Sequence, residues 1–153
     1  MRNTELLKKL EKHKTLDNYN IKIQAIDNLK NKELLPKSII EFYREIGLLE
    51  VGTKSDYLIV DIFEPVFYHE CDYFDLNTEA LFFDLDEKHL LKNILILGVD
   101  IYGILIGYDI TAKTESITLS CEDVTNQGFD KSSLISYVES ILTMDEKYQN
   151  ITV

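Results

Sequence analysis

Residues 94–110 read ILILGVDIYGILIGYDI, and this stretch decides the fold. Two runs of large apolar residues flank a short interruption at residues 100–103. β-branched side chains favour the pleated surface of a sheet, and Gly103 can take backbone angles that are closed to other residues. The stretch therefore predicts two buried strands that meet at a turn in the middle of a sheet. It contains no nucleophile, general base or metal site.

Three helices are expected before this pair of strands. The first covers residues 4–14, where Thr4 is a plausible N-cap and leucines form a narrow stripe among lysines. The second covers residues 21–30, with apolar residues at three-residue steps. The third starts at Pro36, since proline is favoured in the first helical turn, and it stops at Gly47.

Further strands are expected at residues 56–63, 80–85 and 115–120. Both faces of the first are largely apolar, so this strand lies centrally or is covered on both sides. Pro65 ends it or pushes it to a sheet edge. For residues 80–85 a helix remains an alternative, because so short an apolar run does not separate the two.

A closing helix is expected after an N-cap at Asp130. Its apolar side carries Leu134, Val138, Ile141 and Leu142, with polar residues on the opposite side. Helices first, then short strands, then one helix indicate an α+β fold with about five or six strands. All 153 residues are assigned to a single domain, since no linker or repeat divides the chain.

The net charge of −11 is unevenly distributed. Residues 1–54 hold eleven basic and eight acidic side chains, whereas residues 55–153 hold five basic and nineteen acidic ones. Such an acidic surface repels nucleic acids and anionic membranes, and it attracts basic proteins or cations. The alternative is that the acidity serves solubility alone.

The sequence also favours a cytoplasmic location. No apolar run approaches the ~18 residues that cross a bilayer, and residues 1–14 lack the apolar stretch of a secretory signal. Cys71 and Cys121 have no metal-ligand spacing. We therefore expect both cysteines to be reduced thiols, and a disulfide between them stays the alternative, although a chain of this size does not need one.

No cofactor, metal or catalytic residue is expected. His69 and Cys71 would share one face of a strand, but no nearby pair supplies the two further ligands of a zinc site. The acidic cluster at residues 84–87 lacks the glycine and the spaced carboxylates of a calcium loop. Nucleotide-binding glycine motifs are absent as well.

Tyrosines are the better candidates for contacts, because they combine a large apolar body with one hydroxyl group. Tyr102 is expected to be exposed at its turn, followed by Tyr68 and Tyr73 in an acidic connection. Tyr57 and Tyr108 are expected to complete the core.

The helix that opens with Leu35 and Pro36, holds Phe42 and ends at Gly47 resembles the "LP…F…G" element of the SUKH superfamily. This superfamily comprises the Smi/Knr-like fungal cell-wall regulators and many bacterial immunity proteins. The preceding IQAIDNLKNKELLP is similar to the helix that leads into the family's Leu-Pro pair.

Two later segments extend the resemblance to about residues 21–142. Residues 95–109 resemble the family's paired strands around a glycine-containing turn, and residues 129–142 resemble its closing helix. The family's turn usually carries two or three adjacent glycines, whereas this chain has Gly103 alone and no tryptophan.

The resemblance implies a curved, mostly antiparallel sheet with helices packed against it, and no enzymatic activity. It also implies an immunity protein that binds and neutralises a cognate toxin domain, often a nuclease. An acidic inhibitor suits this role, because it can mimic phosphate and associate rapidly with a basic cleft. The expected partner-binding residues are acidic or aromatic, and most lie at strand ends or turns where side chains reach solvent: Asp56, Asp61, Asp100, Tyr102, Asp109, Glu122 and Asp123.

Two other functions remain open at this point. One is a regulatory or scaffold module that binds an endogenous protein, as the fungal relatives are thought to be. The other is a hydrolase that uses a carboxylate pair on a cationic substrate.

Overall fold

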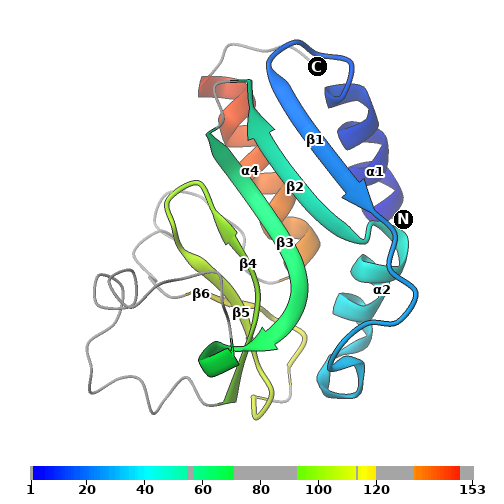
Figure 1. Ribbon diagram of the computed structural model, residues 1–153, viewed down its shortest axis with the longest axis vertical. Coiled ribbons are helices and arrows are strands. Elements are labelled where there is room, and N and C mark those ends of the chain that lie inside the picture. The colour runs from blue at the N-terminus through cyan, green and yellow to red at the C-terminus, as the bar shows by residue number, and fades with distance from the viewer. Residues whose placement is uncertain (1, 55–56, 71–92, 113, 120–132, 149–153) are drawn as a thin grey trace.

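A six-stranded antiparallel sheet carries helices α1, α2 and α4 on one of its faces (Figure 1). The computed structural model describes residues 2–54, 57–70, 93–112, 114–119 and 133–148. The sheet is curved, and its strands follow one another in space in the same order as along the chain. The predicted α+β fold, with N-terminal helices and one C-terminal helix, is confirmed. The strands are β1 (Tyr19–Gln24), β2 (Leu48–Thr53), β3 (Leu58–Phe67), β4 (Ile94–Asp100), β5 (Leu105–Asp109) and β6 (Thr118–Leu119).

Helix α2 begins and ends at the residues that the sequence indicated. Pro36 lies at the N-cap of α2, and Gly47 follows its end with a φ angle of 93°, in the region that favours glycine. The predicted first, third and closing helices are therefore confirmed. No helix among the described residues is long and apolar enough to span a membrane. The helices are α1 (Arg2–His13), α2 (Lys37–Glu45) and α4 (Leu134–Tyr148), with single 3₁₀ turns at Lys32–Leu34 and Tyr68–Glu70.

The predicted helix at residues 21–30 is wrong, because residues 19–24 form β1 at the edge of the sheet. The segment YNIKIQ alternates strictly, and Tyr19, Ile21 and Ile23 pack against the helices while the residues between them are exposed. This period of two is the side-chain pattern of a strand. It outweighs the helical spacing that continues beyond residue 24.

Strand β3 is longer than expected and contains Pro65 in its interior. The expectation that Pro65 ends the strand or lies at an edge is wrong. The register between β3 and β4 shifts between Ile62 and Val66, so the ladder is already interrupted where proline lacks an N–H to donate. Strand β2, which the sequence did not predict, separates β1 from β3.

The predicted pair of strands around the turn at residues 100–103 is confirmed as β4 and β5. Gly103 has a φ angle of 74° in this turn. Strand β6 is shorter than the expected 115–120, and its described part pairs with β5 through two residues. The expected strand at 80–85 and the cap at Asp130 lie outside the described residues.

Apolar side chains are buried on both faces of the sheet. The larger cluster lies between the sheet and the three helices and includes Leu10, Phe42 and Ile141. A smaller cluster on the opposite face joins Tyr68, Ile96, Val99 and Leu105. We call this second side of the sheet the outer face. Its apolar part follows β4 and β5 and includes Leu58 and Phe63 of β3, whereas the outward residues of β1 and β2 are mostly polar.

A polar junction connects α1, β1 and α4. The Tyr19 hydroxyl donates to Asp145 at 2.7 Å, and the rings of His13 and Tyr19 lie 5.0 Å apart. The carboxylate of Glu146 lies 2.8 Å from His13 Nε2 and 3.0 Å from Lys9 Nζ. Burial, together with the bond to Asp145, raises the pKa of Tyr19 far above its usual range. The tyrosine therefore keeps the proton that it donates.

We expect the Tyr19→Phe substitution to lower the free energy of unfolding by about 1 kcal/mol, since it leaves the buried Asp145 carboxylate with one donor fewer. Urea denaturation would measure this loss. Tyr148→Phe is the matched control, because the Tyr148 side chain is 88% exposed. Equal stability of Tyr19→Phe and the wild type would contradict the prediction.

Candidate functional site

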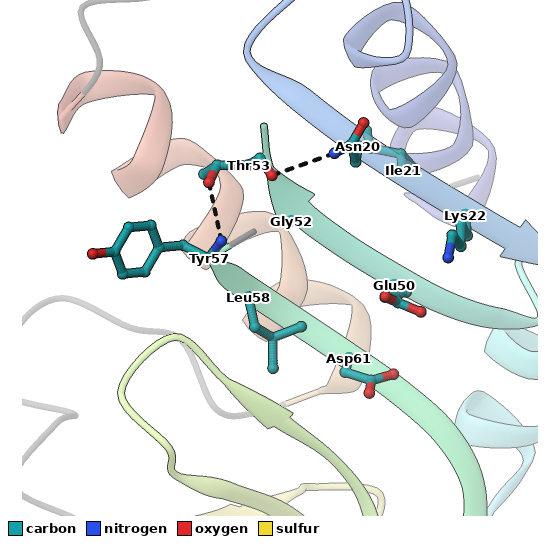
Figure 2. A pocket seen from close by; sticks show the side chains of 9 residues that line it. All are labelled: Asn20, Ile21, Lys22, Glu50, Gly52, Thr53, Tyr57, Leu58 and Asp61. Carbon is teal, nitrogen blue, oxygen red and sulfur yellow. Dashed lines mark hydrogen bonds between the residues drawn. The ribbon is translucent and has the colours of Figure 1, made fainter. Parts of the chain in front are cut away.

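The outer face of β1, β2 and β3 forms a shallow cavity of about 520 Å³ (Figure 2). Polar side chains from all three strands surround it, and Thr53 at the end of β2 and Tyr57 directly before β3 line one end. We call this surface the binding face. The residues that line it are Asn20, Ile21, Lys22, Glu50, Gly52, Thr53, Tyr57, Leu58 and Asp61, of which Ile21 packs its side chain toward the helices.

The strand register brings the charged residues into one row. Lys22 pairs with Glu50 across β1 and β2, and Glu50 pairs with Asp61 across β2 and β3. Side chains of such pairs project from the same face of a sheet, with Cβ atoms about 5 Å apart. Figure 2 shows the three side chains in sequence across the strands. Each comes from a position between two residues that pack toward the helices.

The row has an uneven charge distribution. Glu50 lies directly between a cation, Lys22, and a second carboxylate, Asp61. Like charges at directly opposed positions destabilise a sheet, by up to about 1 kcal/mol. The Glu50 side chain is exposed and that of Asp61 is half-buried, so both can meet a ligand from solvent.

Hydrogen bonds fix the rim of the binding face. The Thr53 N–H donates to the Tyr57 carbonyl at 2.8 Å, and the Tyr57 N–H donates to Thr53 Oγ1 at 3.2 Å. The Asn20 side-chain amide donates to the Thr53 carbonyl at 3.4 Å. Tyr57 is 71% exposed, and its ring points away from the carboxylates (Figure 2).

Among the predicted site residues that the structure describes, Asp61 alone lies on the binding face. Tyr102 is 49% exposed at the β4–β5 turn, as predicted. Asp109 ends β5, where it pairs with Ile94 at the far end of β4, and its carboxylate accepts hydrogen bonds from Thr111. Asp56, Glu122 and Asp123 lie outside the described residues.

The expectation that the Asp100 side chain reaches solvent is wrong, because Asp100 is 1% exposed. Its carboxylate accepts the N–H groups of Tyr102 and Ile104 at 2.9 and 3.0 Å and the hydroxyl of Tyr137 on α4. Val60, its partner in β3, faces the helices, and Asp100 therefore faces them too. Asp100 holds the turn and the helix together and is not available to a partner.

Burial is the main cause of a raised pKa at Asp100, although the hydrogen bonds from Tyr137, Ile104 and Tyr102 oppose it. Burial raises the pKa of Tyr137 far above its usual range, and the hydrogen bond to Asp100 raises it further. The proton therefore stays on the tyrosine, which donates it to the carboxylate.

Of the predictions for the tyrosines, some are confirmed and others are wrong. Tyr108 belongs to the core as predicted, with 5% exposure. Tyr57 was expected in the core and is exposed, whereas Tyr68 was expected at the surface and is buried in the smaller cluster. Both predictions are wrong because residue 57 precedes β3 and residue 68 follows it, so each lies outside the strand's alternation. Tyr73 is outside the described residues.

Sequence reasoning missed Asn20, Lys22 and Glu50. Asn20 fell in the loop expected before the predicted helix at residues 21–30, and Lys22 fell within that helix. Glu50 lies on a strand that was not predicted. The alternation of residues 19–24 was the available signal, since it puts Asn20 and Lys22 on one face. Nothing local pairs Glu50 with Asp61.

The binding face suits recognition through charge and hydrogen bonds. It offers two carboxylates, one ammonium group and one side-chain amide around a shallow floor. No group of three or more histidine, cysteine or acidic residues in the described part of the chain is arranged to hold a metal ion. Of His69 and Cys71, which were weighed as a zinc pair and set aside, Cys71 lies outside the described residues.

Comparisons of the chain with protein-family models, curated proteins and solved structures find no match. The resemblance to the SUKH superfamily therefore remains a prediction from the sequence.

Proposed function

We propose that this protein binds a basic partner protein through the binding face and thereby neutralises a toxin domain, as an immunity protein does. The observation that carries the proposal is the opposed pair Glu50 and Asp61 on an accessible sheet face. The identity of the partner as a toxin rests on the SUKH resemblance.

An opposed carboxylate pair supports binding better than it supports folding. Like charges at paired positions repel, so this pair contributes less to the contact between β2 and β3 than an opposite-charge pair would. A lysine or arginine of a partner placed between Glu50 and Asp61 would offset that repulsion and gain two charge-assisted contacts. An arginine guanidinium fits best, because its planar fork can meet both carboxylates at once.

The charge of the whole chain supports the same class of partner. A net charge of −11 attracts a basic protein over distances beyond contact and accelerates its association. It acts against nucleic acid, which carries the same sign. We propose that both proteins meet in the cytoplasm, where the toxin must be blocked before it acts, and that no catalysis by this chain is involved.

Removing both carboxylates, with Glu50→Gln and Asp61→Asn, is expected to slow association roughly tenfold at low ionic strength. The basic protein that co-purifies with the wild type from its native cells, once identified and purified, serves as the partner. Stopped-flow or biosensor traces at several salt concentrations give the association rate constant. The difference between variant and wild type should shrink as salt rises, because salt screens the attraction.

The matched control removes two exposed carboxylates elsewhere, with Glu33→Gln and Glu45→Gln, so that the net charge changes equally. If the binding face itself is the site, the control variant must slow association clearly less than the Glu50→Gln and Asp61→Asn variant does. If both double variants associate at the same rate, only net charge matters and the binding face is not the site.

A further inference from the structure

The exposed large apolar side chains gather at one end of the molecule. Within the described part of the chain, four such residues are exposed: Tyr57 at 71%, Ile101 at 43%, Tyr102 at 49% and Tyr148 at 88%. Single exposed apolar residues are common on any surface, whereas exposed apolar residues that adjoin one another form the kind of patch that marks interaction sites. We call this group the hairpin end.

The strand register brings two turns to the hairpin end. Val60 of β3 pairs with Asp100 of β4. Tyr57 lies three residues before Val60, and Ile101 and Tyr102 directly follow Asp100, so all three extend past this pair in the same direction. At about 3.3 Å per residue and about 4.8 Å between strands, Tyr57 and the β4–β5 turn lie within roughly 10 Å of each other.

The last turn of α4 reaches the same end. Tyr19 pairs with Thr53, directly before the β2–β3 turn, and the Tyr19 hydroxyl is bonded to Asp145. Tyr148 follows Asp145 by three residues and ends the helix. Figure 1 shows the C-terminal end of α4 beside the end of β2 and the start of β3.

Hydrogen bonds order the backbone at both exposed tyrosines, Tyr57 and Tyr102. Tyr57 exchanges two hydrogen bonds with Thr53. The Tyr102 N–H is bonded to the buried Asp100 carboxylate, and the Gly103 N–H is bonded to the Asp100 carbonyl at 2.9 Å. These bonds order the backbone at both residues, so binding costs less conformational entropy than it would on a flexible turn. Tyrosine is also enriched among the residues that dominate interface energies.

We infer that the hairpin end is the part of the interface that sets the lifetime of the complex, with Tyr57 and Tyr102 inserted into apolar pockets of the basic partner. This inference rests on the proposed function. The two surfaces are continuous, because Tyr57 belongs to the binding face as well. A second copy of the chain is the less suitable occupant, since two molecules that each carry −11 repel one another.

The two parts of the interface then act on different rate constants. Charges on the binding face control association, while buried aromatic contacts at the hairpin end control dissociation. The double variant Tyr57→Ala and Tyr102→Ala is expected to dissociate at least roughly tenfold faster from the purified partner, with association changed less than about twofold. Tyr57→Phe with Tyr102→Phe, which keeps both rings, is expected to dissociate at nearly the wild-type rate.

Unchanged dissociation of the alanine variant would overturn the inference. The proposed function would still stand in that case if the Glu50→Gln and Asp61→Asn variant associates slowly. Normal association of that carboxylate variant would refute the proposed function, whatever the tyrosine variants do.

Photo-crosslinking provides an independent test in the native cells. A photoreactive residue in place of Tyr57 or Tyr102 is expected to form an adduct with the same basic protein. The control is the photoreactive residue in place of Gln24, an exposed residue at the other end of β1. An adduct between two copies of the chain, equal adducts at residue 24, or no adduct at residues 57 and 102 would overturn the inference.

Discussion

Replacing Asp100 by alanine is expected to lower the free energy of unfolding by about 4 kcal/mol, because three buried or partly buried donors lose their acceptor. These donors are the Tyr137 hydroxyl and the N–H groups of Tyr102 and Ile104. The substitution also releases the β4–β5 turn from α4. Urea or thermal denaturation followed by circular dichroism would measure the loss.

Asp109→Ala is the matched control for this experiment. Asp109 also ends a strand and accepts hydrogen bonds from its own turn, but the bonds from Thr111 are exposed. We expect a loss of at most about 0.5 kcal/mol there, since water replaces the lost acceptor. Similar losses at Asp100 and Asp109 would contradict the structural role of Asp100.

The pH dependence of Asp100→Asn provides a further check. Burial raises the pKa of Asp100 above its ordinary value of 3.8. A carboxyl group with a raised pKa in the folded state contributes stability at low pH and loses it as the pH rises through the folded pKa. The wild type should therefore gain stability relative to Asp100→Asn as the pH is lowered from neutral toward about 4. A constant difference across this range would contradict the raised pKa.

Gly98→Ala is expected to have the second largest effect, a loss of about 3 kcal/mol at the upper end of the range for overpacking. A Cβ atom on Gly98 would overlap the backbone carbonyl oxygen of Asp61 on β3 and come within 2.8 Å of Ile62 Cδ1. Backbone cannot rotate away as a side chain can. The central pair of strands must therefore separate at the irregular register beside Gly98.

Gly52→Ala is the control, because its Cβ atom would lie 3.1 Å from the Tyr57 carbonyl oxygen, a contact relieved by a shift of a few tenths of an ångström. We expect a change of at most about 1 kcal/mol from this variant. Chemical denaturation of both variants tests the comparison. An equally stable Gly98→Ala protein would show that β3 and β4 can move apart without loss.

The sequence predicted those elements whose signals are local. Pro36 and Gly47 delimit α2, the leucines of residues 4–14 give α1, and residues 94–110 give β4 and β5. The helix expected at 21–30 was wrong because the segment satisfies two periods over a short length. Pairing with β2, which is a tertiary contact, selects the period of two.

The binding face was largely beyond prediction from the sequence. Asp61 was found through its charge, but the row that it shares with Lys22 and Glu50 is created by two strand registers. Asp100 illustrates the opposite error. A charged residue at a turn is usually exposed, and its burial depends on Tyr137, which lies 37 residues away along the chain.

The sequence by itself determined the α+β class, the position of the central hairpin and the excess of negative charge. These properties follow from composition and from short-range periodicity, which each segment carries without its neighbours. The tertiary structure alone decided which charges are accessible and which side chains meet. Register and helix packing bring together residues distant in sequence, and for this reason Glu50 faces Asp61 while Asp100 faces the core.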